Sequence, residues 1–109
     1  MRRGEIWSAA GGPDYAGKPR PVLIIQSDDF DATLSITICA FTSRENPMAL
    51  ARVDVEPTAT NGLRSHSQLM VDKITTLPRA KLGRRIGKLA EDDVLRMNRA
   101  LMVFLGLAE

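Results

Sequence analysis

The hydrophobic positions along the chain form several short runs. The four residues Val22–Ile25 are all large and apolar, and a run this short predicts a strand buried on both faces rather than a helix. Residues 34–41 alternate apolar with small side chains, and residues 52–57 alternate apolar with charged ones, so both segments are predicted to be strands. Weaker patterns of the same kind predict further strands at 5–8, 69–75 and 83–88.

One longer segment, residues 91–105, has the periodicity of a helix that ends at Gly106. Its apolar stripe consists of Val94, Met97, Leu101 and Leu105, widened by Leu95, Met102 and Phe104. Single helical turns are predicted at 27–31 and 78–82. Several strands followed by one terminal helix predict a mainly β (α+β) fold with the helix packed on the sheet. We expect residues 1–109 to form a single domain.

Composition narrows the class of protein. Apolar residues make up 44% and charged residues 26% of the chain, which is typical of a globular protein, and no run is long enough to span a membrane. Cys39 is the only cysteine and lies in an apolar run, so we expect it to be an inert core thiol. Residues 1–5 lack the apolar segment of a secretory signal, and one cysteine makes no disulfide within the chain, so we expect a cytoplasmic location. The net charge is only +2, so any affinity for nucleic acid must depend on where the cations lie.

Most standard catalytic sites are excluded. The chain has no phosphate-binding glycine loop, no nucleophile elbow and no helix carrying two histidines. The single histidine, His66, lies in a polar segment and is predicted to be a surface residue, while Trp7 is predicted to pack in the core. One histidine and one cysteine do not make a zinc site within one chain unless several carboxylates converge on them. We therefore expect neither a metal nor another cofactor.

The remaining chemistry consists of cations and hydroxyls at strand ends. Arg20 stands between Pro19 and Pro21, which restrict the direction in which it leaves the strand. A solvated strand-entry residue and a functional cation are equally good interpretations of this pattern. Thr42 ends the next predicted strand. An arginine and a hydroxyl suffice for metal-free cleavage of RNA, because the substrate supplies its own 2′-hydroxyl as the nucleophile.

A second basic feature is the segment 79–88. It holds Arg79, Lys81, Arg84, Arg85 and Lys88 with no acidic residue among them. The pattern fits a solvated basic face and a surface that follows RNA phosphates equally well. The glycine-rich loop 9–17 adds Asp14 and Tyr15, with Lys18 just beyond.

In the order and spacing of its motifs, the chain resembles the MazF/PemK toxins of bacterial toxin–antitoxin systems across nearly its whole length. The matching pieces are Arg3–Trp7, Arg20–Ile25, Phe41–Ser43, Asn61–Leu63, Ser67 with Asp72, Leu82–Gly87 and Leu105–Leu107. The resemblance implies a small, strongly bent, SH3-like antiparallel barrel with a C-terminal helix. It also implies a homodimer that is neutralised by an antitoxin with an acidic C-terminal segment.

The activity implied by the resemblance is that of an mRNA interferase. Such an enzyme is a sequence-specific, metal-independent endoribonuclease that cuts single-stranded RNA and leaves 2′,3′-cyclic phosphate and 5′-hydroxyl ends. By position, Arg20 and Thr42 match the catalytic residues of the family. The residues expected to bind RNA are Ser43, Lys18, Asp14, Tyr15, Lys73, Arg79, Arg84 and Arg85.

The chain also departs from the family pattern. Asp14 and Tyr15 occupy the neighbourhood in which some members place a glutamate proposed as the base, so the general base stays open. Lys73 replaces a frequent glutamine and Ala40 a usual proline, so we expect a different RNA target sequence. The alternative function is a toxin of the same fold that acts on a protein such as DNA gyrase. That class uses a C-terminal tail beyond the helix, whereas here only residues 107–109 follow, which favours the nuclease.

Overall fold

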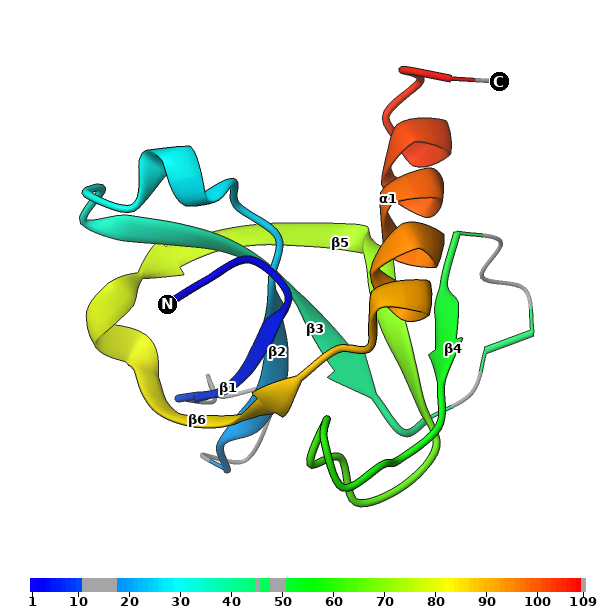
Figure 1. The fold of residues 1–109 in the computed structure, drawn as a ribbon, viewed down its shortest axis with the longest axis horizontal. Coiled ribbons are helices and arrows are strands. Elements are labelled where there is room, and N and C mark those ends of the chain that lie inside the picture. The colour runs from blue at the N-terminus through cyan, green and yellow to red at the C-terminus, as the bar shows by residue number, and fades with distance from the viewer. Residues whose placement is uncertain (11–17, 45, 48–50, 109) are drawn as a thin grey trace.

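The computed structural model describes residues 1–10, 18–44, 46–47 and 51–108, and within them the chain folds into one antiparallel sheet and one α-helix (Figure 1). The strands are β1 (Glu5–Ala9), β2 (Arg20–Ile24), β3 (Ser35–Thr42), β4 (Val53–Val55), β5 (Ser67–Pro78) and β6 (Leu82–Lys88). Two short 3₁₀ turns, η2 (Asp28–Phe30) and η3 (Arg79–Lys81), connect strands, and α1 (Glu91–Phe104) follows the last strand. The predicted mainly β fold with a C-terminal helix is confirmed.

The six strands lie in the order β4-β5-β3-β2-β1-β6, and every neighbouring pair is antiparallel. Figure 1 shows that the sheet is strongly bent. The strand β5 crosses above β3, and the chain then returns through η3 to β6 on the other side. Irregular pairing between β3 and β5, and again between β1 and β6, accompanies the bend. The turn after β4 reaches the free edge of β6, where the Lys88 amide donates to the Thr60 carbonyl at 3.0 Å.

The strand β2 is buried on both faces, as its apolar run predicts. Leu23 contributes to the core beneath α1, whereas Val22 and Ile24 contribute to a second core on the opposite face of the sheet. All three side chains are 3% exposed or less. Because successive strand residues point to opposite faces, only an uninterrupted apolar run serves two cores at once. The start of β2, which carries Arg20, is therefore followed directly by a strand segment that is buried on both faces.

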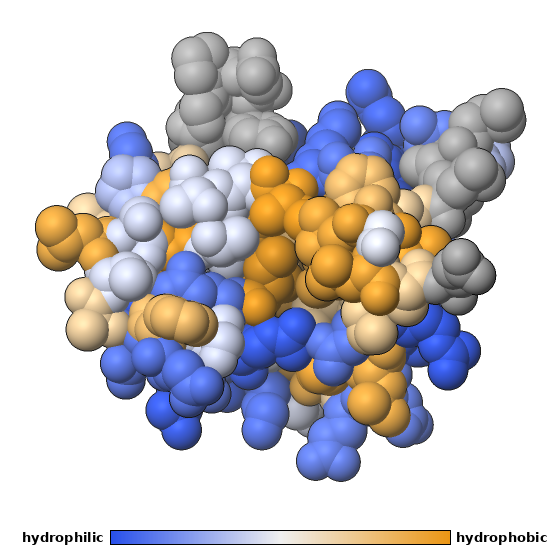
Figure 2. Space-filling model, turned by 90° about the horizontal axis from the view of Figure 1, so that it is seen from above, coloured by the Kyte–Doolittle hydropathy of each residue, from blue (hydrophilic) through white to orange (hydrophobic). Residues whose placement is uncertain are grey.

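The helix α1 packs beside β4 and β5 (Figure 1). Of its predicted stripe, Met97 and Leu101 are buried, and the helix ends before Gly106, whose φ of 76° allows the reversed turn that closes it. Val94 is partly buried and packs against the same core, whereas the other apolar side chains of the stripe face outward. The exposed large apolar residues at this end are Leu95, Met102, Val103, Phe104, Leu105 and Leu107. Figure 2 shows that apolar side chains gather in a patch on the face seen from above, around the end of the helix, with hydrophilic side chains along its lower border.

The element bounds differ from the predicted ones mainly at β4 and β5. Residues 52–57 alternate as predicted, but only Val53–Val55 pair with a neighbour. The strand β5 is longer than predicted because it pairs with β3 along both of its halves, although its outer half is largely exposed. Trp7 is half-buried and packs against the second core, while Cys39 is fully buried as predicted. In the part of the chain described here, no helix has the length and apolar character needed to cross a membrane.

Candidate functional site

A cleft of about 630 Å³ opens beside the start of β2, and we call it the basic cleft. Its described lining comes from all strands except β4, and from the segments before β2, after β3 and before β5. The lining residues are Ser8, Lys18, Pro19, Arg20, Pro21, Phe41, Ser43, Gly62, Leu63, Arg64, Ser65, Ser67, Arg84 and Ile86. The lining thus combines four cations with four serine hydroxyls, and none of these described residues is acidic. Such a lining favours a polyanion.

Four of the residues expected from the sequence meet in the basic cleft. Lys18 comes from the segment just before β2, Arg20 from the start of β2, Ser43 from the residue just after β3, and Arg84 from β6. Arg20 is exposed, is the first residue of its strand, and has Pro19 and Pro21 on either side in the same lining. The prolines restrict the backbone on both sides of the cation, and the buried strand behind it fixes the strand entry.

Thr42 lies next to the basic cleft but is not part of its lining. The strands β2 and β3 pair antiparallel, with Val22 opposite Ala40. Extending this register by two residues places Arg20 opposite Thr42, so the structure brings the two strand ends together as predicted. The Thr42 hydroxyl is half-buried and accepts a hydrogen bond from the Arg44 amide at 3.2 Å. Its neighbour Ser43 is exposed in the cleft.

The other residues expected to bind RNA are not in the described lining of the cleft. Lys73 is exposed in the outer half of β5, and Arg79 and Arg85 make contacts elsewhere. Asp14 and Tyr15 lie outside the described residues.

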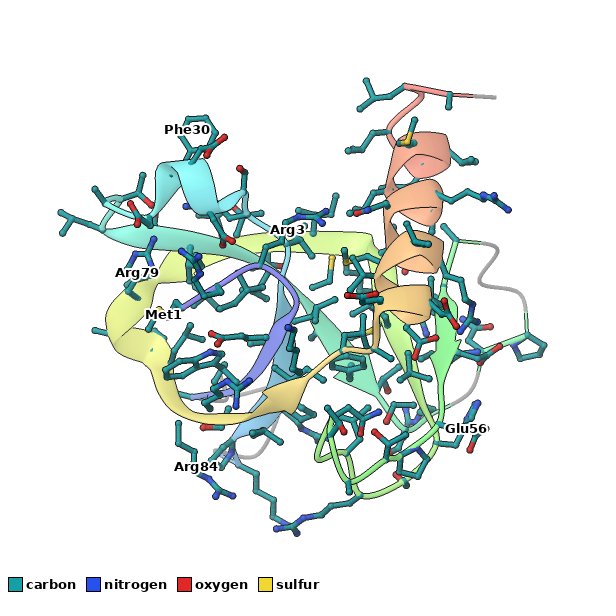
Figure 3. The ribbon with its side chains drawn as sticks, in the orientation of Figure 1. Met1, Arg3, Phe30, Glu56, Arg79 and Arg84 are labelled. Carbon is teal, nitrogen blue, oxygen red and sulfur yellow. The ribbon has the colours of Figure 1, made fainter. Side chains whose placement is uncertain are left out.

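Arg79 has a set of partners near the N-terminus. Its Nε donates to the Thr33 carbonyl, its Nη2 donates to the Phe30 carbonyl at 3.4 Å, and its Nη1 contacts the Met1 sulfur at 3.3 Å. Figure 3 shows Arg79 beside Met1, with Arg84 well below them at the lower edge of the molecule. These contacts hold η2 against the junction of β5 and β6. The structure therefore places Arg79 in a supporting contact, away from the basic cleft.

Arg85 is held by a carboxylate. Its Nε donates to Glu5 Oε2 at 3.0 Å, while Trp7 Nε1 donates to Glu5 Oε1 at 3.1 Å. Partial burial of the Glu5 carboxyl acts to raise its pKa, but hydrogen bonds from the Arg2 amide, Trp7 and Arg85 outweigh it and lower the pKa below its usual value. Glu5 is therefore ionised at neutral pH and keeps Arg85 on the β1–β6 surface.

The arginines fall into two groups by what their guanidinium groups contact. Arg3, Arg52, Arg79, Arg85 and Arg96 each donate to acceptors within the chain. Among the described residues, the guanidinium groups of Arg44, Arg64, Arg84 and Arg99 have no hydrogen-bond or ion-pair partner. Two of these four, Arg64 and Arg84, line the basic cleft, so two of its cations have donors available for a ligand.

Sequence reasoning missed the wall of the cleft that precedes β5. Leu63, Arg64, Ser65 and Ser67 all line it. Leu63 and Ser67 belong to motifs that carry the family resemblance, but the only local sequence signal for Arg64 and Ser65 is the turn motif Asn61–Gly62 before them. Sequence spacing does not show that this segment meets β2 and β6, because the contact depends on the bend of the sheet.

His66 and Cys39 lie outside the basic cleft. The His66 ring is about one-third exposed, and its Nε2 lies 3.5 Å from Asp54 Oδ1 and 3.6 Å from Glu56 Oε1. Burial, with a smaller effect of the Asp72 charge, raises the pKa of the Cys39 thiol to about 11. Within the described parts of the chain, no three potential metal ligands of the histidine, cysteine or carboxylate type come together.

Comparison with known proteins identifies the family. Residues 2–105 match the family described as PemK-like, MazF-like toxin of type II toxin–antitoxin system. The chain belongs to this family. It is 55% identical over 108 residues to a probable endoribonuclease MazF of Mycolicibacterium smegmatis, and the match covers 99% of both chains. The predicted family, and with it the predicted class of endoribonuclease toxin, is confirmed.

Solved structures agree with the fold. The Mycobacterium tuberculosis toxin MazF-mt6 is 28% identical and superposes with a TM-score of 0.80 over 96% of this chain and 99% of that one. A mycobacterial endoribonuclease in complex with its cognate antitoxin is 21% identical, with a TM-score of 0.82 over 100% of this chain and 98% of its own. At this lower identity the likeness concerns the fold alone, and it confirms the predicted MazF-like architecture.

Proposed function

We propose that this endoribonuclease of the MazF/PemK family cuts single-stranded RNA in the basic cleft, in a metal-independent and sequence-specific way. The observation that carries the proposal is the cleft itself. The clamped Arg20, the uncommitted Arg84 and several hydroxyls converge there, and no acidic side chain is among the described lining residues. A phosphodiester backbone matches both the charge and the hydrogen-bond donors of this surface.

The proposed reaction is a transesterification. The 2′-oxygen of the nucleotide on the 5′ side of the cut attacks the adjacent phosphorus, and the bond from phosphorus to the 5′-oxygen breaks. The 2′-hydroxyl loses its proton to a base, and the leaving 5′-oxygen gains one. The products are a 2′,3′-cyclic phosphate and a 5′-hydroxyl. The RNA supplies the nucleophile, so the protein contributes positioning, anion stabilisation and proton transfer.

In this mechanism Arg20 binds the scissile phosphate and stabilises the charge that develops on its oxygens. Its planar guanidinium presents several donors in a fixed arrangement, and the prolines and buried strand reduce the reorganisation that binding requires. Arg20 also donates a proton toward the leaving 5′-oxygen. Thr42, opposite Arg20 in the extended register, hydrogen-bonds a phosphate oxygen or the 2′-hydroxyl, and Ser43 contacts the neighbouring backbone. Asp14 and Tyr15 stay the candidates for the base.

The cations of the cleft bind RNA in different ways in this proposal. Lys18 and Arg84 contact phosphates without reading sequence, because both are exposed in the lining and such contacts carry no base information.

The similarity to named endoribonucleases favours this function over a toxin of the same fold that acts on gyrase. Localisation in the cytoplasm, where the RNA substrate is found, completes the proposal.

We also propose that the protein is a homodimer. Large apolar side chains on the outer side of α1, including Leu95, Val103 and Phe104, are 46–66% exposed. The same three side chains line a groove of about 670 Å³ that α1 forms with residues 51–53, in which apolar residues are joined by Arg52, Arg96 and Arg99. An apolar surface of this kind favours association with a second copy about a two-fold axis.

The proposed protein partner is a cognate antitoxin that covers the basic cleft with an acidic segment. A likeness in fold to an endoribonuclease solved with its cognate antitoxin supports this partner. The lining of the cleft complements an acidic chain for the same reason that it complements RNA. RNA and antitoxin should therefore compete.

A substrate with one altered sugar tests the proposed chemistry. An RNA cut by the protein is compared with the same RNA carrying a single 2′-deoxy nucleotide at the cut position, in buffer containing EDTA. We expect cleavage of the all-ribose RNA to persist in EDTA and to leave a cyclic phosphate, while the 2′-deoxy RNA stays intact. Cleavage of the 2′-deoxy RNA at the same position would contradict the use of the 2′-hydroxyl as nucleophile.

A further inference from the structure

The turn that precedes β5 is held by the side chain of Asn61, which is only 2% exposed. Its Oδ1 accepts hydrogen bonds from the Thr58 amide at 2.9 Å and the Leu63 amide at 3.0 Å, and its Nδ2 donates to the Glu56 carbonyl at 2.8 Å. The backbone N–H of Asn61 in turn donates to the Thr58 hydroxyl at 3.0 Å. One buried side chain thus satisfies three backbone groups of a segment without regular secondary structure.

The same turn is docked on β6 by two glycines. A Cβ atom on Gly62 would lie 2.6 Å from the Ile86 carbonyl oxygen, and one on Gly87 would lie 2.4 Å from the Asn61 carbonyl oxygen. Gly62 also has a φ of 71°, which side chains rarely tolerate. The Lys88 amide donates to the Thr60 carbonyl at 3.0 Å. Backbone contact this close leaves the turn little freedom to move relative to the sheet.

Arg64 follows this fixed turn. It is exposed, lines the basic cleft, and its guanidinium has no hydrogen-bond or ion-pair partner among the described residues. On its other side, the Ser67 hydroxyl donates to the Ser65 carbonyl at 3.0 Å, and Ser67 is buried. Arg64 is therefore a cation on a rigid support whose donors are not used within the described chain.

Arg64 approaches the cleft from a different side than Arg20 does. In the sheet order, β1 and β6 lie between β2 and the turn, which is docked on β6, and these two strands contribute Ser8 and Arg84 to the same lining. A strand adds about 4.8 Å across a sheet, so cations separated by two strands suit different phosphates better than one phosphate.

We propose that Arg64 binds an RNA phosphate next to the scissile one, and that Asn61 is the positioning residue that fixes Arg64 for this contact. The inference rests on the proposed function and adds a subsite to it. Arginine binds phosphate through two parallel hydrogen bonds, which gives the contact a defined geometry. A rigid turn makes the contact at low cost in conformational entropy, because the backbone is ordered before RNA arrives. Arg64 thus fixes the register of the RNA relative to Arg20.

The experiment uses RNAs that each carry one uncharged methylphosphonate linkage, placed in turn at every position around the cut except the scissile phosphate. With the wild-type protein, one linkage next to the cut should raise KM about tenfold, the effect of losing one charge-assisted contact. With Arg64→Ala, KM for the unmodified RNA should rise about tenfold and that linkage should no longer matter. Arg64→Lys should keep part of the sensitivity, and kcat should change little.

Two further variants test the positioning role, both assayed at a temperature at which circular dichroism shows the fold intact. Asn61→Ala removes the buried side-chain amide and its three hydrogen bonds. The milder Thr58→Val removes only the hydroxyl that accepts a hydrogen bond from the Asn61 backbone N–H. Both should reduce the KM effect of the same linkage, Asn61→Ala more strongly. Arg2→Ala is the matched control, because it removes one cation that pairs with Asp28 outside the cleft. It should keep the wild-type linkage profile.

An unchanged linkage profile in Arg64→Ala would overturn the phosphate subsite. A wild-type profile in folded Asn61→Ala would overturn the positioning role and leave Arg64 acting without it. These outcomes are separate from a failure of the proposed function, which would appear as cleavage of the 2′-deoxy RNA by the wild-type protein.

Discussion

Arg84 and Arg85 are adjacent and carry equal charge, yet the structure predicts different effects when each is replaced by alanine. Arg84 lines the basic cleft, and its guanidinium has no partner among the described residues. Arg85 donates to Glu5, whose side chain is 16% exposed. We expect Arg84→Ala to weaken RNA binding and Arg85→Ala to weaken mainly the fold.

The size of each effect follows from the contacts. Loss of one phosphate contact to a single strand lowers the slope of log affinity against log salt by about 0.7. The affinity ratio of wild type to Arg84→Ala should therefore shrink about 2.6-fold when salt rises fourfold. Arg85 is 49% exposed, so after solvent screening its ion pair contributes no more than about 1 kcal/mol to the free energy of unfolding.

Fluorescence anisotropy with a labelled RNA that is 2′-deoxy at the cut position measures the salt slope without cleavage, and urea unfolding measures stability. Arg84→Ala should lower the slope at unchanged stability. Arg85→Ala should lower the free energy of unfolding by a fraction of a kcal/mol, up to about 1 kcal/mol, and leave the salt slope of RNA affinity unchanged. If both variants lowered the salt slope equally, the distinction between arginines held by acceptors within the chain and arginines without such partners would be refuted.

Three further outcomes follow from the structure. The pKa of Glu5 is lowered in the folded state, so its contribution to the free energy of unfolding is present above pH 4.5 and is lost as pH falls through the folded pKa. In urea unfolding at a series of pH values, Glu5→Gln should therefore lose less of its free energy of unfolding on acidification than the wild type does. Sedimentation should show a dimer at micromolar concentration, and the double variant Leu95→Asp with Phe104→Asp should be a monomer; a monomeric wild type would exclude the proposed dimer. Cys39, buried and with its pKa raised to about 11, should react with iodoacetamide only in urea, whereas rapid native alkylation would contradict the described core.

The sequence predicts most of the fold because burial follows local patterns. The run at 22–25 indicates a doubly buried strand, and both cores use it. The helix and the 3₁₀ turn η2 carry signals of their own, the latter through Ser27, whose hydroxyl accepts from the Asp29 amide at 3.2 Å. The length of β5 was not predictable in this way, because its outer half is held by pairing with β3 rather than by burial.

The site was predictable only in part, because sequence shows which residues are charged but not what they contact. Arg20 is marked by its flanking prolines, and its approach to Thr42 follows from antiparallel pairing. Arg79 and Arg84 look alike in the basic segment, yet the carbonyls that hold Arg79 come from residues 30 and 33, far away in sequence. The wall that carries Arg64 meets β2 and β6 only through the bend of the sheet, which no local pattern encodes.

The central claim, that Arg20 acts on the transition state in the basic cleft, is tested most directly by single-turnover cleavage at saturating protein. Saturation restores binding, so Arg84→Ala should then cut at nearly the wild-type rate. Arg20→Ala, with an unchanged circular dichroism spectrum, should remain on the order of a hundredfold slower or more, the scale for loss of one preorganised charge-stabilising donor. Arg20→Lys should rescue poorly, because an ammonium lacks the planar fork. An Arg20→Ala protein that cuts within a few-fold of the wild-type rate at saturation would contradict the claim.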